Sequence, residues 1–327
     1  MMGYVRDYTS HLRQAVEIGR KASFKVPERT FQNIVVTGLG GSGIGGTIIS
    51  QLLEKDLKVP MLVNNDYSLP GFVGEDTLVI VSSYSGNTEE TLSALDIAIA
   101  RGAEIACVSA GGKVIDLAIE KSFNYIQIPW GIPPRGSFGM NSPQLFYVLK
   151  EYGFIDMSFE KELLNAADSI DQHEESMQAE AKVIAEKIDG TIPIIYSDAA
   201  YAGVSIRLRQ QINENAKMLC WHHVFPEMNH NELVGWAGGD NRFSVIMMRT
   251  GADHLRTQMR MNLCKAIFAK HTDTVCEMHA KGDTVIERSY YLIHLGDWVS
   301  VILADMNGVD AIEVDVIDYL KGELAKS

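Results

Sequence analysis

The sequence predicts an α/β protein built from two domains, each with a parallel sheet that helices cover on both faces. The chain has 327 residues, which suits two domains of ordinary size with a core each. Short apolar strands alternate with helical segments over residues 33–152, and a similar rhythm restarts at residue 192, as is typical of doubly wound sheets. A long charged helix is expected over residues 159–188 as the connection. We therefore expect one domain over residues 1–155 and a second over residues 156–327.

Strands are expected where short apolar runs lie between polar or glycine-rich breaks. They cover residues 34–37, 61–63, 77–81, 104–108, 125–128, 192–196, 218–221, 243–248 and 274–278. Helices are expected over residues 4–21, from the first glycine loop to about residue 53, and over 89–100, 114–121, 142–152, 204–217, 255–269, 289–307 and 314–324. A polar loop is expected over residues 222–231.

The composition is that of a globular cytoplasmic protein. A formal charge of −13 disfavours nucleic acid and anionic membranes as partners. The chain has no run of about 18 uncharged apolar residues, so no membrane span is expected. The first 25 residues alternate charged and apolar side chains, unlike a secretory signal. The four cysteines are scattered, which favours reduced, buried thiols over disulfides or a metal site.

Two strand-to-helix connections are rich in small residues. Residues 38–46 read Gly-Leu-Gly-Gly-Ser-Gly-Ile-Gly-Gly, and residues 82–91 read Ser-Ser-Tyr-Ser-Gly-Asn-Thr-Glu-Glu-Thr. Such turns aim unpaired backbone N–H groups and the positive end of a helix at one point, which favours an anion. The second loop adds the hydroxyls of Ser83, Ser85 and Thr88, which can donate to phosphate oxygens. Together the two loops predict a site for a phosphorylated small molecule.

The first loop has two other interpretations. Gly38-x-Gly40-x-x-Gly43 formally matches a dinucleotide fingerprint, and Asp66 lies near the end of the second strand, where a ribose-binding acid would be expected. A dinucleotide site does not need the second loop, however. The glycines could also serve the turn alone, because glycine adopts positive φ at low cost.

Four segments resemble the bifunctional phosphoglucose/phosphomannose isomerase family of the sugar isomerase (SIS) domain superfamily. They are the two loops, residues 211–217 (Gln-Ile-Asn-Glu-Asn-Ala-Lys) and residues 226–232 (Pro-Glu-Met-Asn-His-Asn-Glu), and the resemblance covers nearly the whole chain. The hydroxyl loop marks phosphosugar binding in many SIS domains, whereas the last two segments are more specific to the isomerases. The resemblance implies two SIS-type doubly wound domains. It also implies that the protein interconverts glucose 6-phosphate, and mannose 6-phosphate as well, with fructose 6-phosphate. The reaction would need no cofactor or metal and would serve glycolysis and gluconeogenesis.

The resemblance also implies roles for single residues. Ser42, Ser83, Ser85 and Thr88 would hold the sugar phosphate, and Gly41 would add a backbone contact.

Four further residues match the catalytic positions of the family. Arg135 would lie beside the reacting carbons C1 and C2, and Glu214 would move the proton between them. His230 would open the sugar ring and would come from the partner subunit, which implies a homodimer. Lys321 in the last helix is the best match to the catalytic lysine. One departure precedes that helix: residues 308–314 read Gly-Val-Asp-Ala-Ile-Glu-Val, where the family usually reads Gly-Val-Asp-Pro-Thr-Pro-Val.

The chemistry also follows from the residue types. Moving one proton between adjacent carbons through an enediol needs a single carboxylate and no redox cofactor. Glu214 can supply it, and Asn213, Asn215 and Lys217 could orient it. A guanidinium such as Arg135 can stabilise an enediolate oxygen.

Each of these side chains has a structural alternative. Glu214 could form an exposed helical pair with Lys217, Arg135 could be a surface loop residue paired with a carboxylate, and Lys321 could be a solvated cation at a helix end. A histidine titrates near neutrality and suits ring opening, but His230 could also be a structural residue. A zinc site is a further alternative, although the spacing fits no standard set; it would use His222, His223, Glu227, His230 and Glu232.

Two other functions compete with the isomerase. A non-catalytic SIS module could sense phosphosugars and control a partner, although no basic helix-turn-helix segment is present. A dinucleotide-dependent oxidoreductase would instead use the glycine loop.

Overall fold

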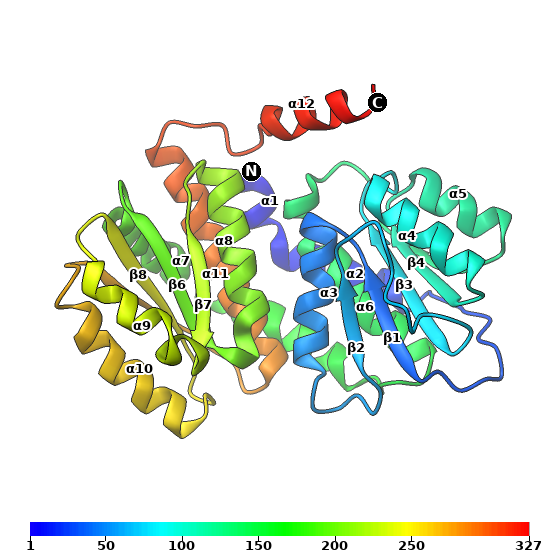
Figure 1. The fold of residues 1–327 in the computed structure, drawn as a ribbon, viewed down its shortest axis with the longest axis horizontal. Helices are drawn as coiled ribbons and strands as arrows, with labels where there is room; N and C mark the ends of the chain where they lie inside the picture. Colours follow the sequence, from blue (N-terminus) through cyan, green and yellow to red (C-terminus); the bar gives the residue numbers. More distant parts are fainter. Residues whose placement is uncertain (327) are drawn as a thin grey trace.

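The computed structural model describes residues 1–326 and contains two parallel β-sheets with helices between and outside them (Figure 1). The first sheet has the strand order β2-β1-β3-β4-β5, and the second has the order β7-β6-β8-β9. The strands are β1 (Asn33–Thr37), β2 (Met61–Asn64), β3 (Thr77–Ser83), β4 (Glu104–Ser109), β5 (Asn124–Gln127), β6 (Ile192–Asp198), β7 (Trp221–Phe225), β8 (Phe243–Arg249) and β9 (Val275–His279). The α/β class with two parallel sheets is therefore confirmed.

The α-helices follow the expected alternation. They are α1 (Met2–Arg6), α2 (Tyr8–Gly19), α3 (Gly40–Leu52), α4 (Glu89–Ala100), α5 (Gly112–Glu120), α6 (Phe138–Glu151), α7 (Ser158–Ile188), α8 (Ala202–Ala216), α9 (Glu232–Gly235), α10 (Leu255–Phe268), α11 (Val285–Met306) and α12 (Asp315–Leu324). Short 3-10 helices are η1 (Pro134–Gly136), η2 (Ala199–Tyr201), η3 (Glu227–His230) and η4 (Trp236–Gly238).

A central helix layer joins the two sheets. Successive residues of a strand face opposite sides, so Val36 of β1 joins the large central apolar cluster while Val35 packs in an outer cluster with α4 and α5. The central cluster also contains Ile195 of β6 and residues of α3, α6, α7, α8 and α11. The expected domain boundary at residues 155/156 falls between α6 and α7, and the apolar core is continuous across it.

Four expected elements differ from the structure. The first helix is interrupted at Asp7 and gives α1 and α2, and α6 and α11 begin at Phe138 and Val285, each four residues before the expected start. The strand expected at 218–221 is instead β7, so His222 and His223 lie in a strand and not in a polar loop. β7 is an edge strand with partly exposed side chains, and it therefore lacks the continuous apolar run that marks the central strands.

The topology places two loops together at one edge of the first sheet. β1 and β3 are neighbours in the sheet. The connection after β1 leads to β2 on one side, whereas the connection after β3 leads to β4 on the other side. This reversal creates a crevice at the carboxyl ends of the strands, where ligands bind in open α/β sheets. The glycine loop after β1 and the hydroxyl loop after β3 flank this crevice.

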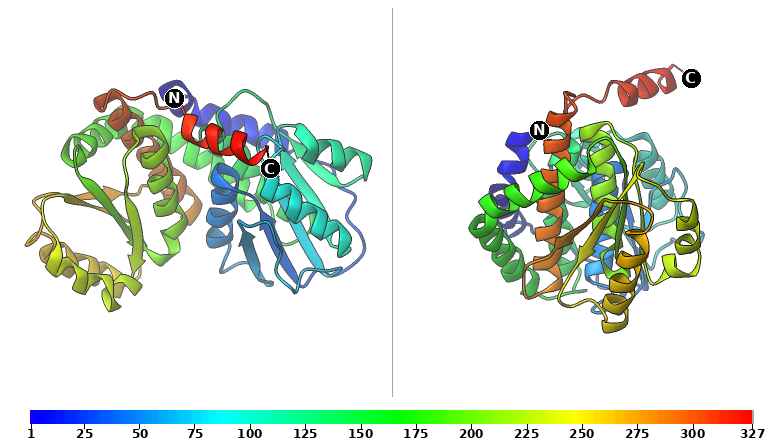
Figure 2. Two further views of the ribbon diagram at one scale, coloured as in Figure 1. Left: turned by 45° about the horizontal axis from the view of Figure 1, so that its top comes forward. Right: turned by 90° about the vertical axis from the view of Figure 1, so that its left-hand side faces the viewer.

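Most of α12 extends away from the rest of the chain (Figure 2), while Val316 and Ile317 in its first turn line a pocket with residues 213–219. It extends from the body of the molecule at the end of a long connection (Figure 2), and all 10 of its residues are exposed. Among the described residues, the helices are too short or too polar for any of them to cross a membrane.

Candidate functional site

The hydroxyls of the two loops are oriented by backbone amides. Ser42 Oγ accepts a hydrogen bond from the Tyr84 N–H at 3.0 Å, and Ser83 Oγ accepts one from the Gly86 N–H at 3.2 Å. Ser85 Oγ accepts one from the Asn87 N–H at 3.3 Å. Because these amides occupy acceptor positions, the hydroxyl hydrogens of the three serines can be donated to an anion.

Two helices begin at the same place. α3 starts at Gly40 and α4 starts at Glu89, directly after Thr88, whose Oγ1 lies 3.1 Å from Ser83 Oγ. The first amides of a helix have no partner within it and carry the positive end of the helix dipole. The loops therefore combine hydroxyl donors with free amides, including that of Gly41. The five residues that the sequence assigns to phosphate binding lie on these two adjacent loops.

Gly41 also connects this crevice to the loop that carries Arg135. A Cβ atom on Gly41 would lie 2.8 Å from the carbonyl oxygen of Pro134 and 3.3 Å from the Arg135 nitrogen. Only glycine permits this close approach of α3 to η1. The first turn of α3 and the arginine loop are therefore packed backbone against backbone.

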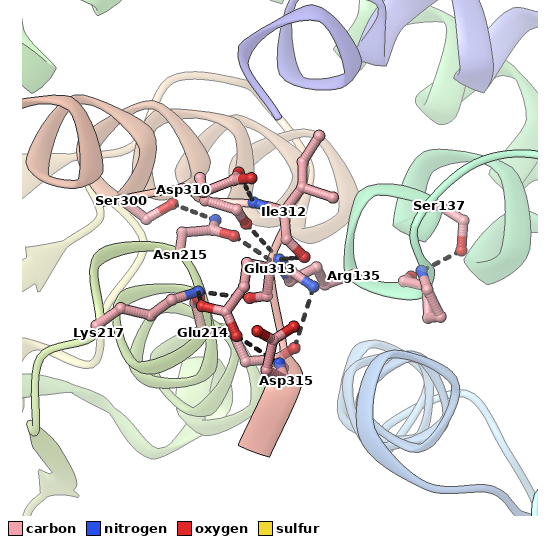
Figure 3. Close-up of polar contacts among 12 residues, drawn as sticks. Arg135, Ser137, Glu214, Asn215, Lys217, Ser300, Asp310, Ile312, Glu313 and Asp315 are labelled. Carbon is pink, nitrogen blue, oxygen red and sulfur yellow. Dashed lines mark hydrogen bonds and ion pairs between the residues drawn. The ribbon is translucent and has the colours of Figure 1, made fainter. Parts of the chain in front are cut away.

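The Arg135 guanidinium is buried between the two halves of the chain (Figure 3). Its Nε donates to Asn215 Oδ1 at 2.7 Å, and its Nη1 lies 3.4 Å from Glu214 Oε2. Its Nη2 donates to the carbonyl oxygens of Ala311 and Ile312, the latter at 3.1 Å. One side chain thus contacts α8 and the segment before α12.

The charges around Arg135 are predominantly negative. Burial lowers the pKa of Arg135, and the carboxylates of Glu214, Asp310 and Glu313 counteract this effect. Three carboxylates near one guanidinium hold it as a cation at the point where the two halves meet.

Lys217 holds the segment before α12 against the end of α8. Its Nζ donates to the carbonyl oxygens of Glu214 at 2.7 Å and Glu313 at 2.6 Å, and lies 3.7 Å from a Glu313 carboxylate oxygen. Lys217 itself has φ of 57°, a left-handed conformation that ends α8.

These contacts bear on the structural alternatives for Glu214 and Arg135. Glu214 forms its ion pair with Arg135 and not with Lys217, so the exposed helical pair is wrong. Arg135 has a relative exposure of 5%, so it is not a surface arginine. Asn215 orients the arginine rather than the Glu214 carboxylate, and its own amide nitrogen is fixed by Ser300 Oγ at 2.9 Å.

Two pockets flank the segment before α12. One, of about 330 Å³, is lined by Ser85, Pro134 and Ile312, so it lies between the hydroxyl loop and the arginine loop. The other, of about 410 Å³, is lined by Glu214, Lys217 and Glu313 together with apolar side chains. The hydroxyl loop and Glu214 therefore open to different pockets, and Arg135 lies between the residues that line them.

His230 is not part of this cluster. β7 runs from the amino edge of the second sheet to its carboxyl edge and leads directly into η3, where His230 is exposed. α8 runs in the opposite direction and carries Glu214 near its last turn. The five residues of β7 span about 16 Å. His230 therefore lies near the carboxyl ends of the strands of this sheet, and Glu214 lies near their amino ends.

Lys321 is the second predicted site residue that lies outside this cluster. It lies two turns into the exposed helix α12, whereas the segment that contacts Arg135 ends before that helix begins. Within residues 1–326, no group of three or more His, Cys, Asp or Glu side chains is arranged to hold a metal ion.

Three partners of Arg135 are not predicted from the sequence. Asn215 is predicted there to orient Glu214, and the carbonyl groups of Ala311 and Ile312 carry no signal in a sequence because every residue has one. The departure at residues 311–313 did mark the segment that reaches the arginine.

The chain is similar to one family of curated proteins over nearly its full length. The profile described as "Bacterial phospho-glucose isomerase C-terminal SIS domain" matches residues 177–324. A bifunctional phosphoglucose/phosphomannose isomerase of Aquifex aeolicus (strain VF5) is 38% identical over 90% of this chain and 91% of its own. One from Caldicellulosiruptor bescii is 35% identical over 100% of this chain and 99% of its own.

Solved structures share the fold at low sequence identity. The C-terminal domain of glucosamine-fructose-6-phosphate aminotransferase from Francisella tularensis has a TM-score of 0.75 at 15% identity, covering 94% of this chain and 97% of that one. Tagatose-6-phosphate ketose/aldose isomerase from Escherichia coli has a TM-score of 0.68 at 13% identity, covering 95% and 94%. Together with the matched SIS-domain profile, these likenesses confirm the SIS-type fold.

Proposed function

Because the chain belongs to the bifunctional phosphoglucose/phosphomannose isomerase family, we propose that it interconverts glucose 6-phosphate, and also mannose 6-phosphate, with fructose 6-phosphate. The observation that carries this proposal for these residues is the Arg135–Glu214 ion pair, whose arginine is buried and whose arginine loop packs against Gly41 at the start of α3. The pair offers a carboxylate base and a fixed cation, which are the groups that an enediol reaction needs.

The ester group of the substrate binds at the hydroxyl loop in this proposal. The hydroxyls of Ser42, Ser83, Ser85 and Thr88 donate to the phosphate oxygens, and the Gly41 amide adds a further donor. Support comes from the backbone amides that already occupy acceptor positions on three of these serines.

Glu214 and Arg135 carry out the proton transfer. The Glu214 carboxylate takes the proton from C2 of the open-chain aldose; the C2–H electron pair forms the C1–C2 double bond while the C1=O π pair moves onto O1. A proton passes from the O2 hydroxyl to O1, the C2=O bond forms, and the double-bond pair takes the proton back at C1 from the same carboxyl group to give the ketose. Arg135 stabilises the negative charge that develops on the sugar oxygen.

His230 opens the ring and acts in the site of the partner subunit. Its position at the opposite sheet edge from Glu214 supports a homodimer, since a second copy is needed to bring the imidazole to the carboxylate. Lys321 joins the same site in this proposal, and α12 packs against the rest of the protein only after the two subunits have assembled. The exposure of all residues of α12 in one chain supports that arrangement.

We further propose that residues 1–155 act as the ester-binding domain and residues 156–327 as the domain of Glu214 and His230. The enzyme works in the cytoplasm, in glycolysis and gluconeogenesis. Its four cysteines are free and buried, as suits a reducing compartment.

A coupled assay with both aldose phosphates in the presence of a chelator tests the reaction. The Glu214→Gln variant should bind glucose 6-phosphate within about threefold of wild type and lose about 10²–10⁴-fold in kcat. Glu186→Gln, on the exposed face of α7, is the matched control and should retain full activity. Ligand binding without turnover by the wild type would instead indicate the phosphosugar sensor.

Mixing two inactive variants tests the shared site. Glu214→Gln and His230→Ala chains, unfolded and refolded together in equal amounts, form heterodimers with one intact composite site. They should recover about a quarter of wild-type activity if the histidine acts across the interface. No recovery, with dimers present by light scattering, would show that His230 acts within its own chain.

A further inference from the structure

Tyr84 belongs to the hydroxyl loop, but its side chain leaves that loop. It lies between Ser83 and Ser85, and its relative exposure is only 4%. The ring stacks on Trp130 with centroids 5.6 Å apart and planes 19° from parallel. Trp130 is part of the loop that leads to Arg135.

The backbone of Tyr84 is fixed between the glycine loop and the loop that follows β4. Its N–H donates to Ser42 Oγ at 3.0 Å, and its carbonyl accepts from the Ala110 N–H at 3.0 Å. Any ligand that orders Ser42 and Ser83 therefore also orders the backbone of Tyr84.

The phenol of Tyr84 holds the arginine loop at two points. Its O–H donates to the carbonyl oxygen of Pro129 at 3.1 Å, and its oxygen accepts from the Ile132 N–H at 2.8 Å. Burial raises the pKa of Tyr84, so the phenol keeps its proton and remains a donor at neutral pH. Ile132 is followed by Pro133 and Pro134, whose fixed φ angles make the connection to Arg135 stiff.

We infer that Tyr84 is a positioning residue that couples the ester-binding hydroxyls to the placement of the Arg135 guanidinium. The inference rests on the proposed isomerase function and adds to it a physical connection between the two halves of the substrate site. Occupation of the hydroxyl loop steadies Tyr84, and Tyr84 steadies the loop that brings Arg135 to the reacting carbons. Phosphate binding thus contributes to the chemical step as well as to affinity.

Tyr84→Phe keeps the ring and its stacking but removes both phenol hydrogen bonds. We expect kcat to fall by about 10- to 100-fold, because the Ile132 amide loses a buried acceptor and the arginine loop loosens. KM should change by less than about threefold, because the serine hydroxyls remain. The control is Tyr4→Phe, which removes the other phenol bonded to this loop, the 3.3 Å contact with the Gly131 carbonyl, and should leave kcat within about twofold.

Two kinetic results would overturn the inference. A Tyr84→Phe enzyme with the kcat of Tyr4→Phe would show that the phenol does not place the arginine. A raised KM at unchanged kcat would make Tyr84 part of the ester cradle only.

Hydrogen exchange separates this inference from the proposed reaction, because it needs no turnover. Exchange in peptides covering residues 128–136 should be faster in ligand-free Tyr84→Phe than in Tyr4→Phe. Saturating glucose 6-phosphate should slow it in the wild type and in Tyr4→Phe but not in Tyr84→Phe. That result in a wild type without turnover would reject the reaction and retain the coupling. Equal exchange in both ligand-free variants would reject the coupling, whatever the activity.

Discussion

The Nε of Arg135 donates to Oδ1 of Asn215 at 2.7 Å, although the two residues are 80 positions apart in the chain. Asn215 has a relative exposure of 0%, and Ser300 accepts from its amide nitrogen at 2.9 Å. This amide can therefore adopt only one orientation, with its oxygen toward the arginine. The guanidinium is thereby turned so that Nη1 faces Glu214.

Replacing Asn215 by alanine should misorient the arginine. The buried Nε–H would lose its acceptor at a cost of about 1–3 kcal/mol, and kcat for glucose 6-phosphate should fall by about 10- to 100-fold with little change in KM. Steady-state kinetics with both substrates would measure this. Asn213→Ala removes an amide from the same helix that bonds to the Met218 carbonyl instead, and should stay within about threefold of wild type. Equal effects of the two substitutions would contradict an orienting role.

Adding one methyl group at Gly41 should displace the arginine loop. The new Cβ would lie 2.8 Å from the Pro134 carbonyl oxygen, and backbone atoms cannot move aside cheaply. We expect Gly41→Ala to lower kcat by at least about tenfold, as small misplacements of reacting groups do.

Gly45→Ala is the control in the same helix. Its Cβ would meet only ordinary contacts, the nearest at 3.9 Å, and the change should raise helix stability by up to about 1 kcal/mol. Thermal unfolding and kinetics together distinguish the two positions; an active Gly41→Ala enzyme would show that the close approach is unimportant.

Ser83→Ala should weaken phosphate binding. One hydrogen bond to a charged oxygen is worth about 1.5–3 kcal/mol, so KM and the inhibition constant of inorganic phosphate should rise by about 10- to 100-fold. The neighbouring Ser82 points to Asn141, whose amide lies 3.4 Å from Ser82 Oγ. Ser82→Ala should therefore leave both constants nearly unchanged. Unaltered phosphate inhibition in Ser83→Ala would contradict the assignment.

The stability of the protein should fall as the pH drops below 6.5, partly through His222. Burial, with Arg209 and His223 nearby, lowers the pKa of His222 from 6.5 to about 4. Between these values the unfolded chain binds a proton that the folded chain does not, so the free energy of unfolding rises with pH. His222→Asn should flatten this dependence in urea unfolding between pH 6.5 and 5.

The sequence alone determined most of the elements and the two loops rich in small residues that follow β1 and β3. Apolar runs such as residues 77–81 are buried on both faces and so identify their strands, and the small residues after them follow from the local turn. β7 was misplaced because its half-exposed edge position leaves no such run. These features are local, and local patterns are what a sequence displays.

Only the tertiary structure decided how the polar residues meet. Asn215, Glu214 and the carbonyls of Ala311 and Ile312 surround Arg135 because the two sheets share one helix layer. The same arrangement leaves His230 at the far edge of the second sheet. Contacts across such sequence distances depend on the packing of whole elements, and packing is set by the combined shape of the core rather than by any one segment.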